Sequence, residues 1–323
     1  MVNIFSKSND RTTDEVIEYL RYFSSSEIQR VQGDNEYSNL RILISNESDS
    51  VKLNDTQNKE YNVKRNTGWL RRGVLSFNIP IDLESFSMPI KEHIIQEVSF
   101  IKEYIYSYSL KLGNFHREIN NNRLINILIA KECGFKVPNT MVTTSKADLL
   151  SFIEKHSSIV AKPIHNGHLS FKHDNIKYDR KGTQILDYDF ISKLESRFSP
   201  SLFQEYIDKD IELRVFYLKG KFFPMAIFSQ LDEKTKYDYR NYNKIKPNRD
   251  VPFKLNLEIE NKISEFMKKS ALETGSIDII LTPNGEYYFL EVNPTGQFGW
   301  VSVDCNYYIE REIALNLINN EIR

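Results

Sequence analysis

Apolar and polar residues alternate in two distinct ways along this chain, and the pattern changes near Gly113. Before it, the apolar positions of 88–112 recur mostly at spacings of three and four, which predicts one long amphipathic helix. After it, short apolar stretches alternate with helical periods, which is typical of an α/β or α+β domain. Strands are expected at 141–143, 159–162, 202–207, 213–218, 222–228, 277–281 and 287–292, and helices at 122–133, 148–155, 255–273 and 307–320.

The first 112 residues carry a weaker pattern. Residues 14–23 are a short helix candidate that Thr13 opens, and the alternation over 40–44 predicts a strand. The segment 45–67 is polar and rich in turn-forming residues, and ordered structure is expected to resume at Trp69. We interpret this part of the chain as an N-terminal domain that the long helix closes.

Composition narrows the class of protein. The chain has 323 residues, of which 40% are hydrophobic and 27% charged, enough to bury a sizeable core in more than one domain. The net charge of −1 provides no general attraction to nucleic acid or anionic lipid, so neither is expected as a partner. The sequence contains only two cysteines and no apolar run of about 18 residues, so we expect a cytoplasmic protein without a membrane span.

Three oxygen-bearing side chains near the C-terminus form the first candidate site. Asp278 and Glu291 lie about equally far from the turn at 283–285, so an antiparallel pair would point both to one face. Asn293 follows Glu291 by two residues and shares that face. Two carboxylates and an amide suit Mg²⁺, although solvated polar residues on an outer sheet face would give the same pattern.

Three further strands carry residues that suit a nucleotide. Lys162 ends an apolar strand and could place a point charge on a phosphate, or it could be an ordinary surface lysine. Arg214, which shares a strand face with Glu212, could hold a phosphate through two hydrogen bonds, or it could belong to a cross-strand Glu/Arg pair. The backbone of 204–207 could border an adenine.

Taken together, these segments resemble one family. Ala-Lys-Pro at Lys162, Gln-Glu-Tyr-Ile at 204–207, Glu-Leu-Arg at 212–214, Ser-Ile-Asp at 276–278 and Leu-Glu-Val-Asn-Pro at 290–294 resemble the motifs of an ATP-grasp ligase. The resemblance covers roughly residues 115–323. It implies an α+β protein of the ATP-grasp fold, with an N-terminal α/β domain at 1–112 and two α+β subdomains at 113–198 and 199–323 that clamp ATP.

A narrower resemblance lies in three segments. Residues 122–140, with Asn-Arg-Leu and Val-Pro-Asn-Thr, and residues 293–299, Asn-Pro-Thr-Gly-Gln-Phe-Gly, resemble the ATP-grasp enzymes that cyclise graspetides, the microviridin-type peptides. The tail at 304–310 resembles the grasp-with-spasm peptide maturases, a branch that acts beside a SPASM-domain protein. The family also suggests a homodimer.

The resemblance implies roles for particular residues. Lys162 would contact the α- and β-phosphates of ATP, and Arg214 would stabilise the γ-phosphate during transfer. The adenine and ribose would lie against Gln204, Glu205, Ile207 and Asp208. Two Mg²⁺ ions would be held by Asp278, Glu291 and Asn293, with Glu291 bridging them.

The implied reaction joins two side chains of a ribosomal precursor peptide. An Asp or Glu carboxylate would be activated as an acyl phosphate and transferred to a Thr or Ser hydroxyl or a Lys amine. Arg240 and Glu212 are the candidates for substrate binding, and the basic segment 234–249 suits an acidic core peptide. The alternatives are another ATP-grasp ligase that adds amino acids to a protein, an ATP-grasp kinase, and a non-catalytic nucleotide- or peptide-binding module.

Overall fold

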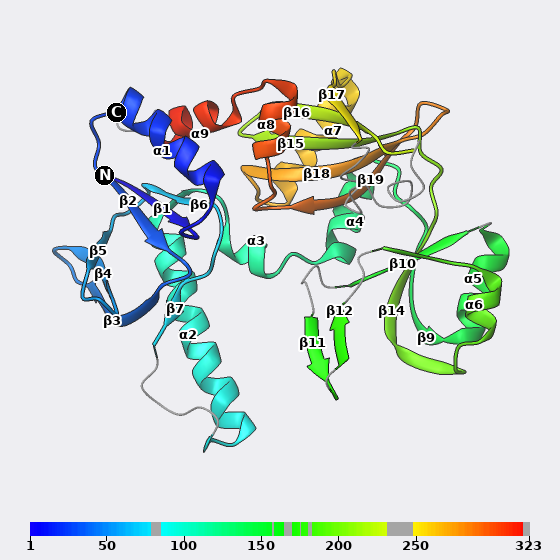
Figure 1. The fold of residues 1–323 in the computed structure, drawn as a ribbon, viewed down its shortest axis with the longest axis horizontal. Coiled ribbons are helices and arrows are strands. Elements are labelled where there is room, and N and C mark those ends of the chain that lie inside the picture. Colours follow the sequence, from blue (N-terminus) through cyan, green and yellow to red (C-terminus); the bar gives the residue numbers. More distant parts are fainter. Residues whose placement is uncertain are drawn as a thin grey trace. The chain divides into compact units, whose positions relative to one another are not determined.

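The computed structural model describes residues 1–78, 85–156, 158–164, 170–174, 176–179, 183–230 and 248–318. The chain divides into two compact units, drawn in Figure 1. Unit 1 comprises 1–120, 271–275 and 294–323, and unit 2 comprises 121–270 and 276–293. The subdomain boundaries at 112 and 198 stay a prediction.

A parallel sheet forms the centre of unit 1. Its strand order is β2-β1-β6-β8, where the members are β2 (Ile28–Gln32), β1 (Val2–Ser6), β6 (Gly68–Leu70) and β8 (Leu110–Leu112). Helix α1 (Arg11–Phe23) connects β1 to β2 in a β-α-β unit. This helix begins three residues before the expected Asp14, because Asp10 caps it by accepting a hydrogen bond from the Thr13 N–H.

A second, mainly antiparallel sheet completes the N-terminal part of unit 1. Its order is β5-β4-β3-β7, with β5 (Glu60–Val63), β4 (Asp49–Asp55), β3 (Glu36–Ile44) and β7 (Ser76–Phe77). Strands β4 and β5 correct the turn-rich interpretation of 45–67. Only every second side chain is buried there, as with Val51 and Leu53, so the intervening polar residues concealed the strands.

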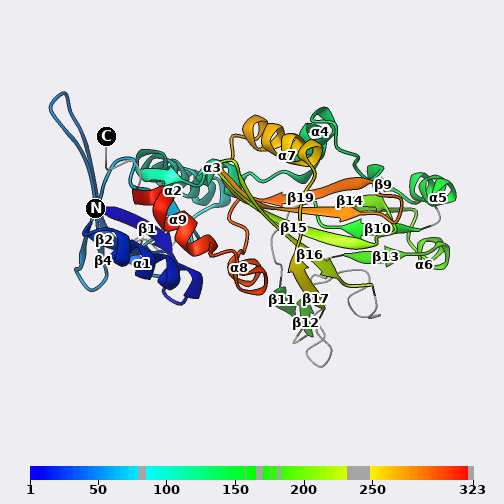
Figure 2. The same cartoon turned by 90° about the horizontal axis from the view of Figure 1, so that it is seen from above.

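Unit 1 also contains helices from distant parts of the sequence. The predicted long helix is α2 (Met88–Ser109); it ends at Ser109, because Leu110 turns extended and begins β8. Short helix α3 (Phe115–Ile119) follows. Near the C-terminus, α8 (Gly299–Cys305) was not expected, and α9 (Ile309–Ile318) packs against α1 (Figures 1 and 2).

Unit 2 contains a four-stranded antiparallel sheet. The order is β13-β10-β14-β9, with β13 (Gln184–Leu186), β10 (Ile159–Lys162), β14 (Arg197–Glu205) and β9 (Thr140–Ser145). Helices α5 (Lys146–Lys155) and α6 (Tyr188–Ser192) cover it through a core that includes Leu149, Phe152 and Phe203. A separate hairpin pairs β11 (Ser170–His173) with β12 (Ile176–Asp179).

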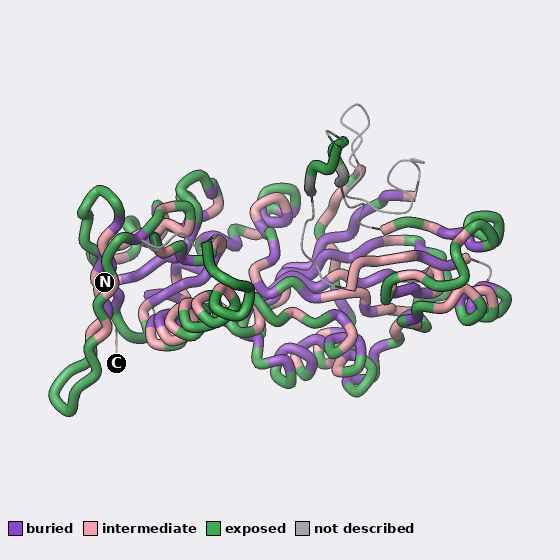
Figure 3. The backbone as a smooth tube through the Cα atoms, turned by 90° about the horizontal axis from the view of Figure 1, so that it is seen from below, coloured by how far each residue is buried: buried purple, intermediate pink, exposed green. Residues whose placement is uncertain are grey.

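A five-stranded sheet carries most of the candidate chemistry. Its order is β17-β16-β15-β18-β19, with β17 (Arg249–Pro252), β16 (Lys221–Phe228), β15 (Ile211–Leu218), β18 (Thr274–Leu281) and β19 (Tyr287–Asn293). Helices α4 (Arg123–Glu132) and α7 (Leu257–Lys269) lie beside it, and Phe266 packs on Phe289. Figure 3 colours the backbone by burial, and in the central strand β15 of this sheet every residue except Ile211 is buried. The α+β class is therefore confirmed. In the described part of the chain, no helix combines the length and apolar character that crossing a membrane requires.

Candidate active site

Asp278 and Glu291 lie directly opposite each other on β18 and β19. This register is the one expected from the turn between the two strands. Both carboxylates are partly exposed, and a β-bulge follows Asp278. Asn293, exposed at the end of β19, lies opposite Ser276. The strand pairing therefore brings two carboxylates and one amide oxygen to the same end of the sheet.

Each of these carboxylates is bound by a buried arginine. The Arg214 Nη1 lies 2.7 Å from the Asp278 Oδ1, and the Arg123 Nη2 lies 2.6 Å from the Glu291 Oε2. Arg214 comes from β15, the neighbour of β18 in the sheet. Charge-assisted hydrogen bonds of this length fix both partners in orientation as well as position.

Arg123 is a site residue to which the sequence analysis gave no role. It is 6% exposed and donates both to Glu291 and to the carbonyl oxygen of Pro163, the residue after Lys162. One guanidinium thus connects the end of β10 to β19. The only signal in the sequence was its place in the Asn-Arg-Leu motif, because its partners lie far away along the chain.

Glu212 is buried on the same strand as Arg214. Its Oε1 accepts a hydrogen bond from the Ser229 Oγ at 2.8 Å and contacts the Lys209 ammonium. Burial raises the pKa of Glu212, and the nearby Asp278 carboxylate adds to that effect, whereas Lys209 and Ser229 act against it. This buried ion pair holds the turn before β15, while the predicted substrate role of Glu212 remains a prediction.

Lys162 and Gln204 lie on the paired strands β10 and β14, two register positions apart. Lys162 ends β10 opposite Leu202, and Gln204 is fully buried on β14 opposite Val160. The Gln204 Nε2 donates to the Thr140 hydroxyl at 2.9 Å, whereas its buried Oε1 accepts a hydrogen bond from none of the described residues.

The segment that follows Gln204 is held by the loop before β9. The Glu205 carboxylate accepts hydrogen bonds from the Asn139 backbone N–H at 2.9 Å and side-chain amide at 3.0 Å, and His156 lies 3.1 Å away. Ile207 is half-buried and Asp208 is exposed. These contacts fix the position of Glu205, and the contact of this backbone with adenine stays a prediction. Arg240 lies outside the described residues.

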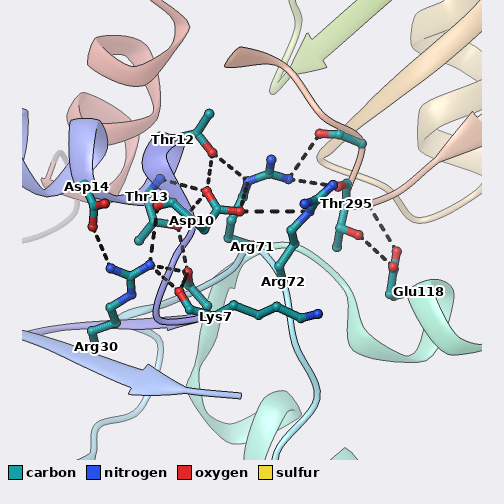
Figure 4. A network of polar contacts seen from close by, with 12 residues as sticks. Lys7, Asp10, Thr12, Thr13, Asp14, Arg30, Arg71, Arg72, Glu118 and Thr295 are labelled. Carbon is teal, nitrogen blue, oxygen red and sulfur yellow. Dashed lines mark hydrogen bonds and ion pairs between the residues drawn. The ribbon is translucent and has the colours of Figure 1, made fainter. Parts of the chain in front are cut away.

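The loop that follows β19 belongs to unit 1 and is held there by a polar network (Figure 4). The buried Arg71 donates to the carbonyl oxygens of Thr295 at 3.0 Å and Gly296 at 3.4 Å, and it pairs with Asp10. Glu118 accepts from the Thr295 N–H and hydroxyl. No pattern in the sequence indicated that Arg71 and Glu118 fix this loop.

The side-chain oxygens of Asp278, Glu291 and Asn293 suit a hard cation. Among the described residues no group of three His, Cys, Asp or Glu side chains is placed to hold a metal, and the predicted set contains only two such residues. One or two carboxylates with neutral oxygens and substrate phosphates are the usual environment of Mg²⁺. The donor set at the end of β18 and β19 therefore fits that ion.

Comparison with known proteins identifies the fold. No family model matches the chain. A RiPP-associated ATP-grasp ligase from Chryseobacterium gregarium, solved with ADP and a leader and core peptide, superimposes with a TM-score of 0.79 and 26% identity, covering 99% of this chain and 97% of that one. The chain has the ATP-grasp fold. Macrocyclase MdnC from Microcystis aeruginosa, solved with precursor peptide MdnA, gives a TM-score of 0.78 at 22% identity, covering 99% and 100% of the two chains.

A curated relative matches a shorter part of the chain. The glutathione synthetase of Wigglesworthia glossinidia brevipalpis is 25% identical over 217 residues, 66% of this chain, and the match spans 64% of that enzyme. The similarity to ATP-grasp peptide ligases extends over nearly the whole chain, so the predicted resemblance to them is confirmed. The grasp-with-spasm branch stays a prediction.

Proposed function

We propose that this ATP-grasp protein is an ADP-forming ligase that closes ester or amide rings in a ribosomal precursor peptide. The observation that carries the proposal is the pair of opposed carboxylates, Asp278 and Glu291, each held by a buried arginine. The C. gregarium ligase, which binds ADP and a leader and core peptide, supports the substrate class at 26% identity.

The chemistry requires two anions to approach each other, a peptide carboxylate and a triphosphate. Asp278, Glu291 and Asn293 would hold Mg²⁺, which supplies positive charge to the phosphates. Lys162 and Arg214 add charge from two different sheets, and the segment from Gln204 to Asp208 borders adenine and ribose. Lys162, Arg214, Asp278, Glu291 and Asn293 lie on strands β10, β15, β18 and β19, so little reorganisation is needed when charge develops.

The bond changes follow from this arrangement. A carboxylate oxygen of the peptide attacks the γ-phosphorus, and the bond to the β-phosphate oxygen breaks, which leaves ADP and an acyl phosphate. A hydroxyl or amine of the same peptide then attacks the acyl carbon. Phosphate leaves, and the nucleophile loses its proton. The sum is the loss of one water for each ring.

The proposed partner is a precursor peptide with a leader and a core. Glu212 and Arg240 are proposed to contact it, with Arg240 as the group that orients the carboxylate. Association with a SPASM-domain protein, a homodimer and a cytoplasmic location are further proposals that rest on the family resemblance.

Product mass tests the reaction class directly. A short peptide encoded by a neighbouring open reading frame, with a core rich in Thr and Asp or Glu, would be incubated with the protein, ATP and Mg²⁺. We expect the peptide to lose the mass of one water per ring while ADP and phosphate form. Addition of an amino-acid residue would indicate the ligase alternative, addition of a phosphate would indicate a kinase, and an unchanged peptide with unconsumed ATP would indicate a binding module.

Arg240 is tested in the same assay. Replacing it by Ala should abolish ring closure and preserve ATP binding, because the residue is assigned to the peptide and not to the nucleotide. Product formation equal to that of the wild type, with peptide well below saturation, would remove Arg240 from the site.

A further inference from the structure

Three consecutive asparagines, residues 120–122, precede helix α4, and each makes different contacts. Asn122 caps the helix, because its side chain accepts hydrogen bonds from two backbone N–H groups. Asn120 is exposed. Asn121 is half-buried, and its Nδ2 donates to the carbonyl oxygen of Val292 at 2.9 Å. The middle asparagine therefore connects the segment before α4 to strand β19.

Strand β19 is the last strand in the order of the five-stranded sheet, and it pairs with β18. Residues that flank α4 supply two further contacts to its backbone. The Phe289 N–H donates to the Lys136 carbonyl oxygen at 2.9 Å, and the Val292 carbonyl oxygen accepts from Asn121. The second of these contacts falls between two of the proposed metal ligands, one residue from each.

Asn126 fixes the orientation of the Asn121 amide. The Asn126 side chain is buried at 2% exposure, and its Nδ2 donates to the Asn121 Oδ1 at 2.7 Å. An amide side chain has one accepting oxygen and one donating nitrogen, so the oxygen that faces Asn126 leaves the nitrogen for Val292. A reversed amide would place two acceptors together at the Val292 carbonyl. The two asparagines thus specify a single direction of donation.

The end of β19 has most to gain from this hydrogen bond. Arg123 binds the Glu291 carboxylate directly, whereas Asn293 is exposed and is the last residue of the strand. Ends of regular elements open more readily than their centres. The Val292 carbonyl and the Asn293 N–H belong to one planar peptide group, so a contact to that carbonyl also fixes the backbone of Asn293.

We propose that Asn121, oriented by Asn126, is a positioning residue for the Mg²⁺ site. It holds the peptide group between Glu291 and Asn293, so that both side-chain oxygens keep their places when the metal binds. Partners that orient metal ligands typically change metal affinity about ten- to a hundredfold when they are replaced. The role rests on the metal site of the proposed function and extends it to two residues that have no place among the ligands.

Metal binding is measured on the full chain with ADP and without peptide. The probe is Mn²⁺, whose free concentration is followed by electron paramagnetic resonance. Asn121→Asp keeps the size of the side chain and the acceptor for Asn126 but replaces the donor at Val292 by an oxygen. Mn²⁺ affinity should fall about tenfold, whereas ADP affinity measured without metal should not change. A negative charge alone would strengthen cation binding, so a loss reports on the hydrogen bond.

Two further variants serve as controls. Asn120→Asp adds the same charge one residue earlier at an exposed position and should not weaken Mn²⁺ binding. Asn121→Leu removes the hydrogen bond without adding charge and should give the same loss as Asn121→Asp. Thermal unfolding of each variant shows that the fold is retained.

The outcomes distinguish this role from the proposed function. Wild-type Mn²⁺ affinity in Asn121→Asp and Asn121→Leu would overturn the role of Asn121 and leave the metal site standing. Equal losses of Mn²⁺ and ADP affinity would show a general disturbance of the site and would also overturn the role. Failure of the wild type to bind Mn²⁺ together with ADP would remove the metal site itself, and the positioning role with it.

Discussion

Some positions in the candidate active site could be predicted from the sequence, and others could not. The opposition of Asp278 and Glu291 follows from their equal distances to a turn, because strand pairing is a local rule. The role of Arg123 could not be predicted, since its contact with Glu291 joins a helix start to a strand far along the chain. Local patterns predict which residues share a strand face and give no information about long-range partners.

Glu291→Gln tests the proposed metal face. The substitution keeps the size of the side chain and removes one negative charge, so ring formation should fall by at least about a hundredfold, comparable to the loss of one preorganised electrostatic contact. Glu286→Gln on the same hairpin is the matched control, since Glu286 pairs with Lys136 near the surface. Peptide mass after incubation with ATP and Mg²⁺ is the measurement, and full activity of Glu291→Gln would contradict the assignment.

Arg123 provides a test that does not require the peptide. Arg123→Ala leaves the Glu291 carboxylate without its guanidinium and should lower the free energy of unfolding by roughly 1–3 kcal/mol, because Glu291 retains partial access to water. Arg123→Lys keeps the charge but cannot reach both Glu291 and the Pro163 carbonyl, so an intermediate loss is expected. Urea denaturation measures both, and unchanged midpoints would show that the contacts do not contribute to stability.

At the scale of elements, the sequence predicted long periodic segments better than short ones. The expected helices at 88–112 and 255–273 correspond to α2 and α7, with ends that differ by a few residues. Helix α8 was missed, because seven residues after a Pro- and Gly-containing segment provide too little periodicity. Capping residues, such as Asp10 before α1, set the ends that apolar spacing leaves open.

Two asparagine caps allow a matched comparison. Asn122 caps α4 by accepting hydrogen bonds from the Leu124 and Ile125 N–H groups, and Asn256 caps α7 by accepting from the Ile259 N–H. Replacing either by Ala should lower the free energy of unfolding by about 1 kcal/mol. Only Asn122→Ala should also reduce kcat, because α4 begins with Arg123. Equal kcat values in the two variants would show that the Asn122 cap does not influence the active site.

Asp10, the N-cap of α1, predicts that the stability of the fold depends on pH. Burial would raise the pKa of Asp10, but Arg71, Thr12, the Thr13 N–H and Arg72 together lower it below its ordinary value. A lowered carboxylate pKa stabilises the fold above the unfolded-state pKa, and that contribution is lost as the pH falls through the folded-state value. Below about pH 4, therefore, the wild type should lose stability more steeply than Asp10→Asn, as measured by thermal unfolding across pH. Parallel pH profiles would contradict this role.

At the scale of the whole molecule, the order of the chain conceals how the units are composed. Residues 294–318 follow the proposed metal strand but belong to unit 1, where α9 packs on α1 and Arg71 holds the loop at Thr295. A division of the sequence into consecutive segments cannot show that the last segment belongs to the same unit as the first. The resemblance to ATP-grasp proteins supplied the fold class, whereas the assignment of the last segment to unit 1 required the structure.

Removing residues 294–323 should therefore destabilise helix α1, which lies near the other end of the sequence. Helix α9 buries Ile309, Ile313 and Leu317, and α1 buries Val16 and Leu20, so the truncation would expose apolar surface on α1 and leave Arg71 without its carbonyl acceptors. Hydrogen exchange measured by mass spectrometry should show lost protection in α1, while β15 and β16 in unit 2 stay protected and act as the internal control. Unchanged protection of α1, or equal loss in both units, would contradict the division of the chain into these units.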